Sequence, residues 1–134
     1  MKILIVDDDL TNRVLLNKML AGYGECSSEE DGKKALGSFV KSLYDGSHFD
    51  LILLDIMMPN IDGQELLKII RAVEDKWGVK PGDEVKIIMV TALDSPKDAT
   101  EAFFKGFATD YVVKPVDFKV MKEKIDSLFP GKAI

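Results

Sequence analysis

The chain has 134 residues, of which 46% are hydrophobic and 31% are charged, and its formal net charge is −5. This length suits one well-buried domain, and the acidic charge argues against a chain that binds nucleic acid directly. A lone cysteine, Cys26, cannot form an internal disulfide, and the apolar run Ile3 to Val6 is far too short for a signal peptide or membrane insertion. We therefore expect a cytoplasmic protein that binds another protein or a cation.

Short apolar segments alternate with amphipathic segments along the whole chain, and each kind predicts a different element. In chain order we expect a strand over 2–6, a helix with apolar residues at 15, 16, 19, 20 and 23, a strand over 25–28, and a helix with apolar residues at 35, 36, 39, 40 and 43. There follow a strand over 51–54, a helix at 66, 70, 73 and 77, a loop over 74–84, and a strand over 85–90. Last come a helix beginning at Ser95, a strand over 111–113 and a helix at 118, 121, 125 and 128.

Five β/α units of this kind predict an α/β fold, in which helices cover both faces of a doubly wound parallel sheet. The second strand segment, ECSS, is polar for a buried strand, so we expect it at an edge of the sheet. Neither an internal repeat nor a linker divides the chain.

Polar residues follow four of the predicted strands directly. Asp7 and Asp8 follow the first, Asp55 the third, Thr91 the fourth and Lys114 the fifth. In an open α/β sheet the carboxyl ends of the strands share one edge, and ligands bind beyond it. These side chains should therefore converge on one site.

Converging carboxylates repel one another, and a hard divalent cation such as Mg²⁺ relieves the repulsion through oxygen ligands. Lys114 adds an ammonium group and Thr91 a hydroxyl donor. A carboxylate, a cation, an ammonium group and a hydroxyl around one site are what phosphoryl transfer to an aspartate requires.

Each residue alone also has a plainer interpretation. Asp9 suits the N-cap of the first helix, Thr91 could merely end its strand, and Lys114 could be a solvated surface charge. The only histidine, His48, stands in a polar loop segment, which leaves neither a histidine base nor a histidine-based metal site.

The opening segment IVDDDLT resembles the nucleophile motif of the haloacid dehalogenase-type phosphatases. That resemblance implies attack by Asp7, acid–base catalysis by Asp9, and counterparts for Thr91 and Lys114. The further acidic motif that the phosphatases need after their lysine is missing, and Asp55 would have no role.

Four segments in series, ILIVDDD, DLILLDIMMPNIDG, IIMVTA and DYVVKP, resemble the receiver domain of two-component response regulators across residues 2–129. The resemblance implies a flavodoxin-like fold of five parallel strands in the order 2-1-3-4-5 with five helices. It also implies that residues 1–134 form a single receiver domain without an output domain.

In that family the counterpart of Asp55 accepts a phosphoryl group from a phosphohistidine on a sensor histidine kinase or a histidine phosphotransfer protein. The resemblance implies that Asp8, Asp55 and the backbone carbonyl of Met57 bind Mg²⁺, or alternatively Mn²⁺, and that Asp7 acts through a metal-bound water. Lys114 would pair with Asp55 and then with the phosphoryl group.

The resemblance further implies a conformational switch in which the Thr91 hydroxyl moves toward the phosphoryl group and the Tyr111 ring turns inward. The fourth and fifth helices, with the strand between them, would then bind an effector protein or output domain. The chain would be a monomer or a phosphorylation-dependent dimer.

Met57 and Leu93 are apolar at positions that tune dephosphorylation in relatives, so we expect slow autodephosphorylation and no enzymatic turnover of other substrates. We also expect Pro115 to follow a cis peptide bond.

A receiver-like interaction module that is never phosphorylated is the remaining alternative. Such modules usually lose one of the acids or the lysine, whereas this chain keeps both.

Overall fold

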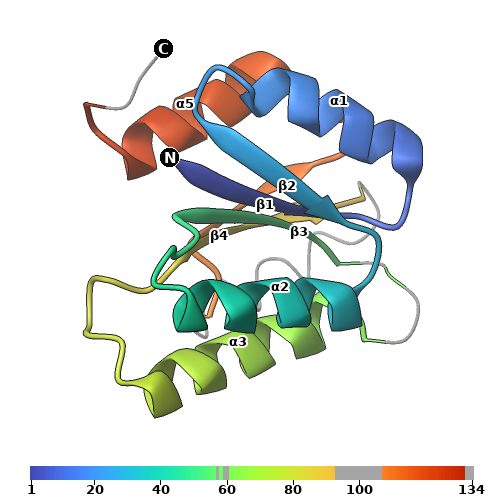
Figure 1. The fold of residues 1–134 in the computed structure, drawn as a ribbon. Helices are drawn as coiled ribbons and strands as arrows, with labels where there is room; N and C mark the ends of the chain where they lie inside the picture. The colour runs from blue at the N-terminus through green and yellow to red at the C-terminus, as the bar shows by residue number, and fades with distance from the viewer. Residues whose placement is uncertain (57, 59–60, 93–106, 132–134) are drawn as a thin grey trace.

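The computed structural model describes residues 1–56, 58, 61–92 and 107–131. Five parallel strands form one sheet in the order β2-β1-β3-β4-β5, which confirms the predicted topology (Figure 1). The strands are β1 (Lys2–Val6), β2 (Glu25–Glu29), β3 (Leu51–Asp55), β4 (Lys86–Thr91) and β5 (Asp110–Val113). The polar strand β2 lies at the edge, as expected, while all five residues of β3 are buried.

Helices cover both faces of this sheet. The described helices are α1 (Leu10–Leu20), α2 (Gly32–Tyr44), α3 (Gly63–Trp77) and α5 (Phe118–Leu128). Figure 1 shows α1 and α5 on one face and α2 and α3 on the other. The helix expected from Ser95 onward lies outside the described residues. Of the helices in the described ranges, none is both long enough and apolar enough to span a membrane.

The core consists of two apolar clusters separated by the sheet, because alternate strand residues point to opposite faces. In β1, Leu4 and Val6 join the cluster beneath α2 and α3, while Ile3 and Ile5 join the cluster beneath α1 and α5. Each cluster buries one face of the sheet and thereby fixes the register of the strands.

An aspartate caps the N-terminus of every described helix, and its side chain accepts a hydrogen bond from a backbone N–H of the first turn. The caps are Asp9, Asp31, Asp62 and Asp117. The capping role predicted for Asp9 is thus confirmed. These caps start the helices close to the carboxyl ends of the strands.

The predicted loop over 74–84 was wrong at its beginning, because α3 continues to Trp77 and ends at Gly78 in a left-handed conformation. Glu74 is buried, and its carboxylate binds the Arg71 guanidinium at 2.7 Å and the Val85 N–H at 2.7 Å. The two glycines and the proline that follow it predicted a loop, whereas the partners of Glu74 keep this residue inside the helix.

Three apolar side chains that the periodicity assigned to buried helix faces are instead exposed: Leu15, Trp77 and Phe118. Trp77 packs edge-on against the Tyr44 ring, with 4.7 Å between the ring centroids. The remaining differences are shifts of one residue at strand ends. β2 and β3 extend to Glu29 and Asp55, β4 begins at Lys86 and ends at Thr91, and β5 begins at Asp110.

Candidate functional site

Three carboxylates meet at the carboxyl edge of the sheet. Strands β1 and β3 are parallel neighbours with Val6 opposite Leu54, so Asp7, Asp8 and Asp55 lie beside one another. One oxygen of each lies within 4.8 Å of the other two. Asp7 is 1% exposed and Asp55 is 4% exposed, while Asp8 is open to solvent. A cation approaching from solvent could therefore reach all three.

Two hydrogen bonds hold Asp7 in place, but one oxygen of its carboxylate has no hydrogen-bond partner. Its Oδ1 accepts a hydrogen bond from the Asp9 N–H at 2.9 Å, and its backbone carbonyl accepts one from Arg13 at 2.7 Å. Among the described residues, Asp7 Oδ2 is the buried side-chain atom that lacks a hydrogen-bond partner. A buried carboxylate oxygen without a partner is costly, so this geometry fits a divalent cation or its hydrating water.

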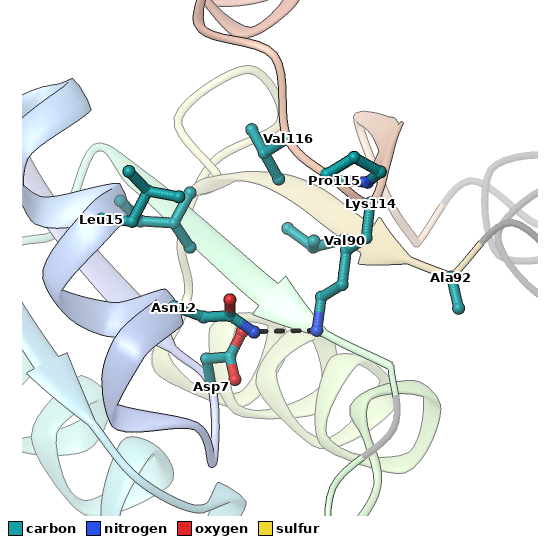
Figure 2. Close-up of a pocket in the computed structure, with 9 residues that line it drawn as sticks. Asp7, Asn12, Leu15, Val90, Ala92, Lys114, Pro115 and Val116 are labelled. Atoms are coloured by element: carbon teal, nitrogen blue, oxygen red, sulfur yellow. Dashed lines mark ion pairs between the residues drawn. The ribbon is translucent and has the colours of Figure 1, made fainter.

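Among the described residues, Lys114 forms ion pairs with two of these acids. Its Nζ lies 3.2 Å from Asp55 Oδ2 and 3.5 Å from Asp7 Oδ2, and Figure 2 shows its side chain directed toward Asp7. The longer contact is an ion pair rather than a good hydrogen bond. One ammonium group cannot neutralise three carboxylates, which leaves room for a second positive charge.

The same acids keep Lys114 protonated. Burial lowers the pKa of its ammonium group, but attraction to Asp55 and Asp7, together with the hydrogen bond to Asp55, outweighs that effect and leaves the pKa raised. The Lys114 N–H also donates to the Thr91 carbonyl oxygen at 2.7 Å, and the peptide bond to Pro115 is cis, as expected. The backbone therefore places this side chain at the site.

Thr91 and Tyr111, the expected switch residues, lie on neighbouring strands. Thr91 ends β4 and is completely buried, and its hydroxyl donates to the Ala92 carbonyl oxygen at 3.3 Å. Tyr111 lies on β5 opposite Met89 and is half-buried. Their positions suit a coupled movement, which remains a prediction.

Some of the expected site residues lie outside the described part of the chain. Met57, whose carbonyl was assigned to the metal, and Leu93 both do, so the carbonyl ligand and slow autodephosphorylation stay predictions. Asp9, the acid–base candidate in the phosphatase interpretation, uses its Oδ1 to accept a hydrogen bond from the Thr11 N–H at 2.8 Å.

Two features of the site were not predicted from the sequence. A Cβ atom added to Gly63 would lie 2.4 Å from the Asp55 carbonyl oxygen, so this glycine lets α3 approach the end of β3. A cavity of about 350 Å³ also opens between α1 and the segment after β5 (Figure 2). Asn12, Leu15 and Val116 help to line it. The adjacent apolar residues Leu15 and Leu16 of α1, which both line the cavity, were the signal that could have revealed it.

Family comparison agrees with this geometry. Residues 3–126 match the model of the response regulator receiver domain. The chain belongs to this family and is therefore a signalling domain with a CheY-like fold.

Similar proteins include one of nearly the same length and others that are much longer. The chain is 34% identical to the chemotaxis protein CheY-3 of Vibrio cholerae, over 96% of this chain and 92% of that protein. It is also 34% identical to the response regulator PleD of Caulobacter vibrioides, over 99% of this chain but 27% of PleD. The chain spans less than half the length of several such relatives.

Solved structures show the same arrangement of strands and helices. The receiver domain of Ssk1 from Saccharomyces cerevisiae, crystallised with the histidine phosphotransfer protein Ypd1, superposes with a TM-score of 0.81 at 26% identity, covering 100% of this chain and 92% of that one. The chemotaxis protein CheY4 of Vibrio cholerae superposes with a TM-score of 0.75 at 27% identity, covering 96% and 98%.

Proposed function

We propose that this domain is a phosphoacceptor switch in which Asp55 receives a phosphoryl group from a phosphohistidine on a partner protein. The observation that carries the proposal is a buried Asp55 carboxylate, 3.2 Å from the Lys114 ammonium and within 4.8 Å of two further carboxylates. An Asp55 oxygen attacks phosphorus, the bond from phosphorus to the histidine nitrogen breaks, and the histidine keeps the bonding electron pair. The product is an acyl phosphate on Asp55.

Each neighbouring residue has a role in this transfer. Asp8 and Asp55, with the Met57 carbonyl, would hold Mg²⁺ or Mn²⁺, and Asp7 would act through a bound water. The cation supplies positive charge to the equatorial oxygens of the phosphoryl group. Lys114 pairs with Asp55 beforehand and with a phosphoryl oxygen afterwards.

Phosphorylation then changes the local charge. The phosphoryl group adds roughly 1.5 to 2 negative charges and three strong acceptor oxygens. The Thr91 hydroxyl turns toward it and the Tyr111 ring moves inward, which alters the face that includes β5 and α5 and so binds an effector protein. The domain acts by binding and by accepting and losing one group, with no further substrate to turn over.

The partner that donates the phosphoryl group would dock beside the cavity next to α1. Leu10, Val14 and Leu15 leave large apolar surfaces exposed on this helix, with Leu10 65% exposed. Exposed apolar surface beside a reactive site is typical of a protein interface. The Ssk1 complex with a histidine phosphotransfer protein supports a partner of that class or a sensor histidine kinase.

One labelling experiment tests the proposal. The wild-type protein is incubated with Mg²⁺ and acetyl phosphate, and the modified residue is located by mass spectrometry. We expect label on Asp55, no label after Asp55→Asn, and slower labelling after Asp7→Asn. Asp9→Asn is the matched control, because asparagine caps a helix as well as aspartate does, and it should label like wild type.

Other outcomes would favour the alternatives. Label on Asp7, with release of phosphate that Asp9→Asn abolishes, would support a phosphatase of the haloacid dehalogenase type. No label on any residue would support a receiver-like interaction module and would contradict the proposal.

A further inference from the structure

Lys124 of α5 contacts two consecutive residues of β5. Its Nζ lies 2.9 Å from Asp110 Oδ1 and 5.4 Å from the centre of the Tyr111 ring. The same Asp110 oxygen accepts the Tyr111 backbone N–H at 2.7 Å. One carboxylate oxygen therefore binds both the lysine and the backbone of the tyrosine, and the ammonium lies within the range of a cation–π interaction.

These contacts pass around the open edge of the sheet. Tyr111 packs against the cluster beneath α2 and α3, whereas Val112 belongs to the cluster beneath α1 and α5, to which Met121 and Ile125 of α5 contribute. Strand β5 is the last strand of the described sheet. Lys124 thus extends from the α5 layer across this edge to a ring that belongs to the opposite layer.

We propose that Lys124 is a positioning residue that holds the Tyr111 ring in its resting place and thereby sets how readily the domain switches. This inference rests on the proposed phosphoryl acceptance at Asp55. An inward turn of the Tyr111 ring takes the ring face away from Lys124 Nζ, so the resting arrangement loses a favourable contact whenever the switch operates.

The expected consequence is a shift of population. A ligand that binds one of two conformations has an apparent affinity reduced by the fraction of molecules in the competent conformation. The cation–π contact, which the inward turn removes, accounts for up to about a fivefold difference in that fraction. Removing Lys124 should therefore make the switched conformation easier to reach.

Beryllofluoride, which mimics a phosphoryl group on an aspartate, is the probe. Lys124→Met keeps most of the side-chain length and removes the charge, and should bind Mg²⁺–beryllofluoride about fivefold more tightly than wild type. Lys124→Arg keeps a cation that can contact both the carboxylate and the ring, and should bind like wild type.

Lys122→Met is the matched control. Lys122 lies on the same helix and forms an ion pair with Asp126 at 2.8 Å, with similar exposure to Lys124. Its loss should leave beryllofluoride affinity at the wild-type value.

The Tyr111 ring resonances, followed by NMR of ¹³C-labelled tyrosine, provide a second measurement. They would not change if Lys124 only stabilised the fold. In unliganded Lys124→Met they should move part of the way toward their positions in beryllofluoride-saturated wild type. The proposal is overturned if Lys124→Met matches Lys122→Met in both affinity and ring resonances, or if it binds beryllofluoride more weakly. A wild-type protein that binds no beryllofluoride would instead overturn the proposed function, and this inference with it.

Discussion

At the scale of single residues, Asp7 carries a conflict between stability and function. Its carboxylate is 1% exposed, one of its oxygens has no hydrogen-bond partner, and two further carboxylates lie within 4.8 Å. Lys114 offsets only part of the repulsion, from 3.5 Å. The same crowding that makes the site attractive to a cation should weaken the fold when no cation is bound.

We predict that Asp7→Asn stabilises the metal-free protein by about 1 kcal/mol, because the substitution removes one buried negative charge and provides an amide donor for a neighbouring carboxylate. Urea unfolding in the presence of EDTA measures this free energy. Added Mg²⁺ should stabilise the wild type by mass action and should stabilise Asp7→Asn less.

Asp31→Asn is the control for this prediction. It also removes one negative charge, at the N-cap of α2, where asparagine is an equally good cap. Both its metal-free stability and its response to Mg²⁺ should match the wild type. Destabilisation of the metal-free Asp7→Asn protein would show that the buried carboxylate is already compensated.

At the scale of elements, the site depends on how closely α3 approaches β3. The Gly63 N–H donates to the Ile56 carbonyl oxygen at 3.0 Å, and a Cβ at Gly63 would lie 2.4 Å from the Asp55 carbonyl oxygen and 2.8 Å from Ile56 Cα. Both close atoms belong to the backbone and cannot rotate away. The first turn of α3 therefore helps to set the position of Asp55.

We predict that Gly63→Ala lowers the free energy of unfolding by about 1–3 kcal/mol, as overpacking does elsewhere, and slows phosphorylation of Asp55. Gly37→Ala is the matched control, because a Cβ at this exposed position in α2 meets no atom within 4 Å. That change should stabilise the protein by about 0.5–1 kcal/mol and leave phosphorylation unchanged. Equal behaviour of the two variants, in urea unfolding and acetyl phosphate labelling, would contradict this role of Gly63.

At the scale of the whole molecule, a hydrogen bond links the segment after α1 to α5, two parts of the chain that are 103 residues apart. The Tyr23 hydroxyl, just after α1, donates to Asp126 Oδ1 of α5 at 2.8 Å, and Lys122 binds the other carboxylate oxygen at 2.8 Å. Burial, then the hydrogen bond to Asp126 and the charge of that carboxylate, raise the pKa of Tyr23 to about 12. The neutral phenol is thus the form that the folded protein favours.

This shift gives a pH dependence of stability with a definite sign. Since the folded pKa exceeds the ordinary value of 10.0, the contribution of Tyr23 is complete below pH 10 and is lost as the pH rises toward 12. We predict that wild type is about 1 kcal/mol more stable than Tyr23→Phe at pH 8 and that this difference disappears over that interval.

Urea unfolding at a series of pH values measures the difference. Tyr44→Phe, which alters an exposed ring, should follow the wild-type curve. A constant difference between wild type and Tyr23→Phe from pH 8 to pH 12 would contradict the prediction.

Much of this architecture could be predicted from the sequence because it depends on local patterns. The apolar segments at β1, β3 and β4, the helical spacing in α2 and the capping position of Asp9 are readable from neighbouring residues. The convergence of Asp7, Asp8 and Asp55 also followed, since parallel strands place their carboxyl ends at one edge.

The tertiary structure decided what depends on distant partners. Glu74 belongs to α3 because Arg71 and the Val85 N–H satisfy its buried carboxylate, and Gly63 is required because the Asp55 backbone lies against it. Lys124 contacts the Tyr111 ring across a sheet edge that no local pattern reveals. Local sequence thus determined which elements form and where the acids gather. Burial and contacts between elements decided which charges are compensated and which side chain lies against the Tyr111 ring.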